Sequence, residues 1–469
     1  MRFTTLIALV FFSTPTFAQS DRYELGRRLH DFEVTWDRHA DDAAAKKRAA
    51  PIVSQAVEKY FGFDIPTASR LVDAARHALE SADPVPAPVR WADALQVLPE
   101  KRVVDASVAD LTVAVKPFYK AEVERPKGVV VRAKIGNGKS VESSIDTLPA
   151  TIKVPIKDAP GPTSADLKLV VEIVTDGNVI ATRSLGVARV ENLAMRVDAI
   201  KKAAKSAPTP PTTIEQASFV LLSSLVDDLA KGKVLETDYP TSRLVFGGER
   251  LAKVTEPYYI ASRPGEFWLR IPVGKEQADV RIRIPPKLEE KKQLVPILFV
   301  LHGLSGSENL FFDGYGNGIV PRLASERGWI VVATKVTGPL GSGPAPDVAG
   351  ILDELSKRYP IDPKRVYLIG HSLGAAHAIL LAQRHPGRFA GIAALGGSGR
   401  VTKPEALKGL PVFVGCGKLD FALTGAKSLQ KSLEDAKAAV TYKEYDDIEH
   451  MLIVREAAAD VFKLFVSKD

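Results

Sequence analysis

The segment from residue 365 to 376, R-V-Y-L-I-G-H-S-L-G-A-A, constrains the fold more than any other part of the chain. A β-prone run, Val366–Ile369, leads directly into G-H-S-L-G, and small residues typical of a helix follow. A serine in G-x-S-x-G between a strand and a helix occupies a sharp turn that lifts its hydroxyl above the sheet. Gly370 and Gly374 leave room for the strand and the helix to approach closely. The pattern predicts a nucleophilic Ser372; the alternative is a tight turn that merely contains serine.

Strands and helices alternate regularly around this segment. Apolar strands that alternate with helices indicate a mostly parallel, doubly wound sheet covered on both faces. We therefore expect an α/β domain over residues 236–469, with its active site beyond the carboxyl ends of the strands. The expected strands are 267–273, 279–284, 296–301, 329–333, 366–369, 390–395, 411–414 and 440–445, and the expected helices are 319–327, 348–359, 423–436 and 452–465.

Two polar residues follow later strands of this domain, in the order that a nucleophile, an acid and a base would need. Asp420 comes after the strand at 411–414, and His450 lies between the last strand and the closing helix. A carboxylate in this place orients an imidazole, which then acts as general base towards the serine. We predict the catalytic set Ser372, Asp420 and His450. Asp446 and Asp447 are the alternative acids, and Asp420 could instead cap a helix or form a surface ion pair.

The loop after the strand at 296–301 reads His302-Gly303-Leu304. Backbone N–H groups beside a nucleophile can stabilise the negative charge of a tetrahedral intermediate. We expect the N–H groups of Leu304 and Leu373 to form such an oxyanion hole. His302 is expected to organise the loop rather than to act as a base.

Aromatic residues follow this loop and could line a substrate pocket or simply pack it. The candidate pocket residues are His302, Phe311, Phe312, Tyr315 and His371. Cys416 is expected to be a buried thiol rather than a nucleophile. No phosphate-binding or dinucleotide-binding glycine pattern and no zinc spacing occurs in the sequence, so we expect no cofactor and no metal.

The first half of the chain shows different periodicities. Apolar residues at helical spacing predict a helical region over residues 19–100, with Thr67 as a cap, and period-two patterns predict a β-sandwich-like domain over 101–190. A helical connector is expected over 191–235, where Thr212 and Glu215 form a capping box, and extended patterns return after Gly232. The β-sandwich is expected to be a spacer or scaffold, with binding as the alternative.

The amino terminus reads as a targeting segment. Residues 1–18 combine Arg2, a short apolar run and small residues before Ala18, which predicts a cleaved signal peptide and a secreted or periplasmic protein. A membrane anchor is the alternative, but the apolar run is too short for a stable membrane span. The formal net charge of +7 is spread along the sequence, which favours a solvated surface and predicts no nucleic-acid partner.

With these motifs in view, the region 267–469 resembles the α/β-hydrolase superfamily. Within it, the sequence is most similar to secreted esterases of the feruloyl esterase and polyhydroxybutyrate-depolymerase type, bordering the prolyl-oligopeptidase-like group. The residues that carry the resemblance are His302-Gly303, the Gly370–Gly374 motif, Asp420 and His450. The resemblance implies hydrolysis of small-molecule or polymer-linked carboxylic esters through an acyl-enzyme. A serine peptidase and a catalytically inactive envelope scaffold remain the alternatives.

Overall fold

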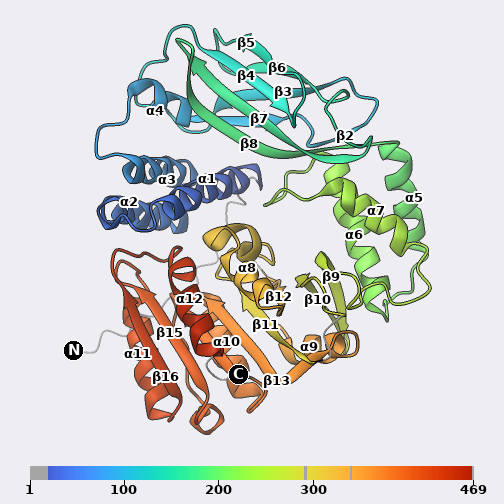
Figure 1. The fold of residues 1–469 in the computed structure, drawn as a ribbon, viewed down its shortest axis with the longest axis vertical. Coiled ribbons are helices and arrows are strands. Elements are labelled where there is room, and N and C mark those ends of the chain that lie inside the picture. Colours follow the sequence, from blue (N-terminus) through green and yellow to red (C-terminus); the bar gives the residue numbers. More distant parts are fainter. Residues whose placement is uncertain (1–18, 290–292, 339–340, 467–469) are drawn as a thin grey trace.

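The computed structural model describes residues 19–289, 293–338 and 341–466. The predicted signal peptide lies outside these residues. The amino-terminal helices are α1 (Gln19–Arg38), α2 (Ala43–Phe61), α3 (Ile65–Glu80) and α4 (Ala87–Asp93). In Figure 1 a β-sandwich is at the top with the short helix α4 beside it, the helices α1 to α3 lie in the middle, and the largest sheet is at the bottom.

The amino-terminal helices begin at acidic caps. Asp42 accepts a hydrogen bond from the N–H of Ala45 at the start of α2, and Asp64 accepts one from the N–H of Thr67 at the start of α3. The expectation that Thr67 caps α3 is therefore wrong by three residues. Thr67 lies inside the first turn, where its N–H needs an acceptor.

Two sheets form the sandwich. One has the strand order β1-β3-β6, and the other has β2-β8-β7-β4-β5. The predicted turn at Asp176-Gly177 joins β7 to β8, with positive φ at both residues, as a two-residue hairpin requires. The strand β1 falls inside the stretch expected to be helical and pairs with β3. The strands are β1 (Leu95–Pro99), β2 (Val103–Asp105), β3 (Asp110–Pro117), β4 (Val130–Ile135), β5 (Val141–Ser144), β6 (Ala150–Pro155), β7 (Ala165–Thr175) and β8 (Asn178–Val190).

A connector of helices follows the sandwich: α5 (Leu193–Lys205), α6 (Ile214–Ala230) and α7 (Thr241–Leu251). The expected capping box on α6 is displaced by one residue. Thr213 accepts from the N–H of Gln216, and the Gln216 side chain accepts from the N–H of Thr212. Glu215 instead forms an ion pair with Arg358. The helix α7 replaces the extended segment expected after Gly232, because Val245 and its neighbours pack into the apolar core.

The largest sheet has the strand order β16-β15-β14-β13-β11-β12-β10-β9. The strands β9 and β10 are antiparallel at one edge, and β11 to β16 run parallel wherever they pair with one another, as the sequence predicts. The strands are β9 (Gly265–Val273), β10 (Glu276–Ile284), β11 (Val295–Leu301), β12 (Ile330–Thr334), β13 (Ile361–His371), β14 (Gly391–Leu395), β15 (Pro411–Gly417) and β16 (Ala439–Tyr445).

Helices cover both faces of this sheet. Alternate residues of a strand point to opposite faces, so Leu298 and Val300 of β11 join one core and Ile297 and Phe299 join the other. The first core also contains residues of α1, α2 and α3, and the second contains residues of α5, α6 and α7. The elements between the strands are η1 (Leu310–Gly314), η2 (Tyr315–Asn317), α8 (Ile319–Glu326), α9 (Val348–Ser356), α10 (Leu373–Arg384), η4 (Pro404–Leu407), α11 (Leu423–Asp435) and α12 (Ile453–Val466).

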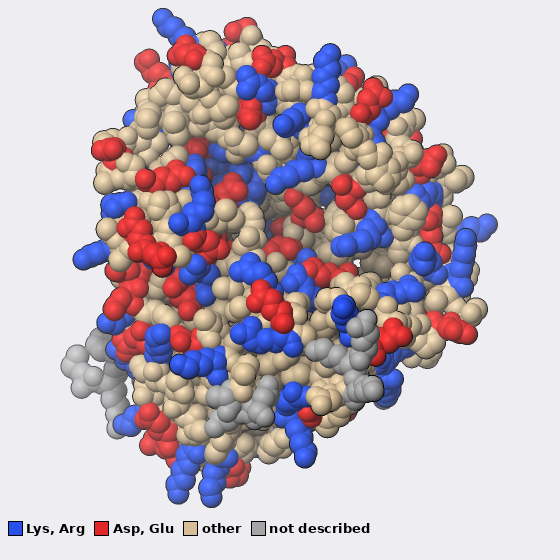
Figure 2. All heavy atoms as spheres, viewed as in Figure 1, with Lys and Arg blue, Asp and Glu red and all other residues tan. Residues whose placement is uncertain are grey.

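Acidic and basic side chains are interspersed over the face shown in Figure 2, which is hollowed between the amino-terminal helices and the sandwich. Among the residues that the structure describes, no helix is both long and apolar enough to cross a membrane.

Candidate active site

The turn at Ser372 has the geometry that its sequence predicts. The strand β13 ends at His371, α10 begins at Leu373, and Ser372 between them has φ 55° and ψ −116°. A non-glycine residue with positive φ is strained and is held only by its surroundings. A Cβ atom on Gly370 would lie 2.0 Å from the carbonyl oxygen of Gly374, and one on Gly374 would lie 2.0 Å from that of Leu301. Glycine is therefore required on both sides of the serine.

Asp420 and His450 meet beyond the ends of β15 and β16. Nδ1 of His450 donates to Oδ1 of Asp420 over 2.9 Å, and both side chains are buried. Burial raises the pKa of Asp420, but the hydrogen bond and charge of His450 and the N–H of Ala422 outweigh it, so the pKa is lowered. The carboxylate therefore stays ionised where it can orient the imidazole.

The alternative acids lie elsewhere. Asp446 is exposed and pairs with Lys418 over 2.6 Å, and Asp447 lies in a turn with φ 53°. Neither residue forms a hydrogen bond with His450 among the described contacts. Asp420 is thus the carboxylate that contacts the imidazole.

The loop after β11 passes directly against the serine. A Cβ atom on Gly303 would lie 3.0 Å from the Cβ atom of Ser372. Within the described part of the chain, the backbone N–H groups of Leu304 and Leu373 donate to no other protein group. Their role as oxyanion donors stays a prediction.

His302 organises this loop through both ring nitrogens. Nδ1 lies 2.8 Å from the carbonyl oxygen of Gly303, and Nε2 accepts from the N–H of Val336 over 3.1 Å. Burial lowers its pKa, which favours the neutral ring that this bonding pattern needs. These contacts leave no ring nitrogen for proton transfer.

His371 links the serine turn to His450. Its Nε2 donates to the carbonyl oxygen of His450 over 2.8 Å, and its Nδ1 accepts from the Tyr315 hydroxyl over 2.6 Å. Burial, and secondarily the neighbouring His450, lower the pKa of His371 to about 3. The ring therefore stays neutral, and it fixes the backbone of His450 rather than moving protons.

The backbone of Gly396 lies close to both Asp420 and His371. Gly396, at the end of β14, has φ 53°, and a Cβ atom there would lie 2.8 Å from Oδ2 of Asp420 and 3.3 Å from Nε2 of His371. A side chain would therefore displace the acid. No local sequence pattern predicts a role for Gly396 or the Tyr315–His371 contact, since only the fold brings these residues together.

A cavity of about 660 Å³ opens on Ser372 and His450. Of the predicted pocket residues, Phe312, Tyr315 and His371 line it, together with the loop at Leu304. His302 and Phe311 do not line it: His302 is turned towards Val336, and Phe311 packs edge-on against Tyr315 with ring centroids 4.8 Å apart.

The amino-terminal region supplies much of this cavity, which the sequence analysis did not foresee. Leu25 and Leu29 lie one turn apart on α1, and Val57, Tyr60 and Phe61 come from α2. Polar lining residues come from the sandwich and the connector, namely Lys168, Ser184, Glu236, Thr237 and Asp238. A possible signal in the sequence was the aromatic cluster Tyr60-Phe61-Gly62-Phe63 at the end of a helix.

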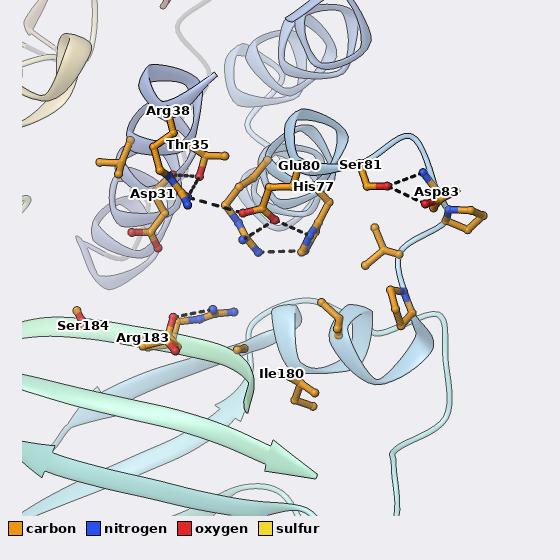
Figure 3. A pocket seen from close by; sticks show the side chains of 18 residues that line it. Asp31, Thr35, Arg38, His77, Glu80, Ser81, Asp83, Ile180, Arg183 and Ser184 are labelled. Carbon is orange, nitrogen blue, oxygen red and sulfur yellow. Dashed lines mark hydrogen bonds and ion pairs between the residues drawn. The ribbon is translucent and has the colours of Figure 1, made fainter. Parts of the chain in front are cut away.

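A second cavity, also of about 660 Å³, lies between α1, α3 and β8 (Figure 3). Its ionic side chains pair with one another or with residues behind the wall: Glu80 pairs with Arg76 and His77, and His77 also bonds Asp93 over 2.6 Å. Burial lowers the pKa of His77, but the hydrogen bonds to Asp93 and Glu80 outweigh it and raise the pKa to about 9. This cavity is part of a polar interface between the helices and the sandwich.

The described residues contain no group of three or more histidine, cysteine, aspartate or glutamate side chains placed to hold a metal ion. Cys416 is buried at the end of β15, and burial together with the neighbouring Asp420 raises the pKa of its thiol. The thiol is therefore protonated and is a poor nucleophile.

A family model described as alpha/beta hydrolase fold matches residues 296–443. A protein named as an esterase, NocK, of Nocardia uniformis subsp. tsuyamanensis is 32% identical, over 24% of this chain and 35% of that protein. An S-formylglutathione hydrolase of Rattus norvegicus is 27% identical, over 24% of this chain and 49% of its own length. The chain thus spans between a third and a half of the curated relatives it matches.

Solved structures are similar to part of the chain. A ferulic acid esterase has 17% sequence identity and a TM-score of 0.36, covering 44% of this chain and 97% of its own. An S-formylglutathione hydrolase (FrmB) from Staphylococcus aureus has 16% identity and a TM-score of 0.35, covering 44% and 99%. The family match, together with the sheet described above, confirms the fold that the sequence predicts for the carboxyl-terminal part.

Proposed function

Starting from a carboxyl-terminal part that has the α/β-hydrolase fold, we propose that this protein is a serine hydrolase that cleaves carboxylic esters through an acyl-enzyme. The observation that carries the proposal is the buried 2.9 Å contact between Asp420 and His450, at a cavity that Ser372 also lines. The match to the alpha/beta hydrolase fold and the similarity to a relative named as an esterase support the same reaction.

In the proposed mechanism, His450 accepts the proton of the Ser372 hydroxyl as the oxygen attacks the ester carbonyl. The carbonyl oxygen becomes negative, and the N–H groups of Leu304 and Leu373 stabilise it. Each such donor contributes about 3–4 kcal/mol to lowering the barrier. Collapse of the intermediate expels the alcohol, which takes the proton from His450. Water then hydrolyses the acyl-enzyme by the same route, with His450 again as the base.

Asp420 acts through His450. Its carboxylate holds the proton on Nδ1, so that Nε2 is the nitrogen that exchanges protons with Ser372 and with the alcohol. His371 and Tyr315 hold the backbone of His450 and are positioning residues.

The substrate is a small-molecule ester or the accessible end of a polymer-linked one, because the cavity at Ser372 is bounded by the amino-terminal helices, the sandwich and connector, and the carboxyl-terminal part. We also propose that the protein is exported, because residues 1–18 have the pattern of a signal peptide. Amino-terminal sequencing of protein recovered from the periplasm or the culture fluid tests this, and an uncleaved Met1 would contradict it.

A fluorophosphonate probe tests the nucleophile. The purified protein should be labelled, and Ser372→Ala should abolish the labelling while the circular dichroism spectrum is unchanged. Folded wild-type protein that the probe does not label would favour an inactive scaffold. Panels of esters and of peptides then separate an esterase from a peptidase.

Asp420→Asn tests the acid. The amide cannot hold the imidazole in the productive tautomer, so turnover of an ester should fall by about 10³–10⁴-fold with the fold retained. The matched control is Asp446→Asn, which removes an exposed ion pair and should change turnover by less than about twofold. Near-normal turnover in Asp420→Asn would move the acid role elsewhere.

A further inference from the structure

Two partly exposed phenylalanines frame the imidazole of His450. The ring of Phe421 lies 4.3 Å from the imidazole, centroid to centroid, and is 64% exposed. The ring of Phe61 lies 6.2 Å from the imidazole and 5.6 Å from Phe421, edge-on to both, and is 37% exposed. Exposure of a phenyl ring to water is unfavourable. Contact with an apolar group would therefore stabilise two such rings beside a reacting group.

These rings come from parts of the chain that lie far apart in the sequence. Phe61 is the last residue of α2, and Phe421 comes directly after Asp420 in the loop that follows β15. The helix is anchored on that loop, because the Ser54 hydroxyl donates to the carbonyl oxygen of Leu419 over 3.4 Å. Val53 of the same helix joins the core beneath the sheet. Phe61 is therefore held in place beside His450 by the packing of its helix.

The chemistry of the reaction says what these rings face. His450 gives its proton to the oxygen of the departing alcohol, so that oxygen must come within hydrogen-bond distance of the imidazole. The carbon atoms attached to it then lie beside whatever flanks the imidazole. The acyl group, in contrast, lies towards the loop at Leu304, where its oxygen meets the N–H donors.

We propose that Phe61 and Phe421 form the binding site for the leaving group, and that the preferred substrates are esters of aromatic alcohols. This inference rests on the proposed function. Phenyl rings offer no hydrogen-bond donor or acceptor, so methyl, ethyl or sugar alcohols gain little from them. An aryl group gains dispersion and edge-to-face contacts with both rings. The amino-terminal region thus supplies a specificity-determining residue to a site whose reacting groups lie in the carboxyl-terminal part.

Two esters with one acyl group test this: benzyl butyrate and ethyl butyrate. The two alcohols need similar help from the general acid, so the ratio of their kcat/KM values reports the contact with the aryl group. We expect the wild-type protein to favour the benzyl ester by about tenfold or more. In Phe61→Ala and in Phe421→Ala the ratio should fall by about fivefold or more, since each ring supplies part of the contact.

The matched control is Phe63→Ala, which removes an exposed phenyl ring two residues from Phe61, just beyond the end of α2. It should leave the ratio unchanged. A ratio near one in the wild-type protein, or a ratio that Phe61→Ala does not alter, would overturn the inference while ester hydrolysis stands. Absence of hydrolysis of both esters, together with absence of fluorophosphonate labelling, would overturn the proposed function itself.

Discussion

Two histidines whose ring centroids lie 4.6 Å apart differ in chemistry because their contacts differ. His450 has a carboxylate on Nδ1, whereas His371 accepts a hydroxyl proton on Nδ1 and donates from Nε2 to a carbonyl oxygen. The carboxylate fixes the tautomer of the His450 ring, and burial lowers the pKa of His371 and keeps its ring neutral. One residue can therefore serve as a base while its neighbour holds it in place.

Tyr315→Phe tests this positioning role. Loss of the hydroxyl leaves Nδ1 of His371 buried without a donor, which costs about 1–2 kcal/mol and frees the ring to rotate. We expect kcat to fall by about five- to thirtyfold with little change in KM, because the substrate contacts remain. The control is Tyr359→Phe, since the buried Tyr359 hydroxyl has no hydrogen-bond partner among the described residues. Equal effects of the two substitutions would argue against a positioning role.

Glu33 is a second buried group whose surroundings set its protonation. Its Oε2 accepts from the N–H of Asn317 in η2, next to Tyr315, and its Oε1 has no partner in the described structure. Burial raises its pKa to about 8, although the N–H groups of Gly316 and Asn317 act in the opposite direction. The folded protein therefore binds this proton more tightly than the unfolded chain does.

The sign of the resulting pH effect follows from linkage. The contribution of Glu33 to stability is fully present below its ordinary pKa near 4.5 and is lost as the pH rises through about 8. Glu33→Gln should remove this loss. The free energy of unfolding of the variant, taken relative to that of the wild type, should therefore rise by several kcal/mol between pH 5 and pH 9, since one pKa unit corresponds to about 1.4 kcal/mol. Urea unfolding at both pH values measures it, and the exposed Glu58→Gln is the control. A stability difference that does not change with pH would refute the prediction.

Sequence reasoning identified residues that follow strands, and it failed for residues that only the fold brings together. Ser372 and Asp420 follow apolar runs and His450 follows the last strand, and the alternation of the domain placed these strands in one sheet. Tyr315 precedes His371 by 56 residues, and no local pattern connects them.

At the scale of elements, the strands were easier to predict than the helix ends. Parallel strands buried on both faces read as continuous apolar runs, and all seven residues of β11 are buried. Caps depend on single side chains, so Asp64 and Thr67 could not be separated from the sequence alone. The helix α7 escaped prediction because Gly247 and Gly248 lower its intrinsic helix propensity, and packing against α5 and α6 compensates.

Asp42 offers a test of one such cap on the helix that carries Phe61. Its Oδ1 accepts from the N–H of Ala45 over 2.9 Å. Asp42→Ala should lower the free energy of unfolding by about 1 kcal/mol, because the N–H loses its partner at the helix end. Asp41→Ala, one residue earlier and exposed, should change it by less than about 0.5 kcal/mol. Equal losses in the two variants would show that Asp42 does not act as a cap.

At the scale of the whole molecule, the apolar cores do not respect the boundaries of the predicted regions. One core joins the amino-terminal helices to the large sheet, and another joins that sheet to the connector and to Val103 and Val190 of the sandwich. Polar contacts join the regions as well: Asp238 accepts from the hydroxyl of Tyr23, the guanidinium of Arg102 and the N–H of Gly186. The sequence could separate these regions by their periodicity, but it held no information about contacts over such distances.

Shared cores predict cooperative unfolding. No region can lose its structure without exposing apolar surface of another, so the chain from residue 19 to 466 should unfold in a single calorimetric transition. The calorimetric enthalpy should equal the van't Hoff enthalpy. Two resolved transitions, with one retained when the residues before 236 are deleted, would instead mean that the regions are thermodynamically independent.

The cavity wall lies partly outside the segment that the hydrolase family shares, since α1 and α2 precede residue 296. Selection could therefore alter which esters fit without touching the reacting groups. Recombination that exchanges the amino-terminal segment between related genes would transfer the preference for the alcohol part of the ester. The reacting residues would stay the same.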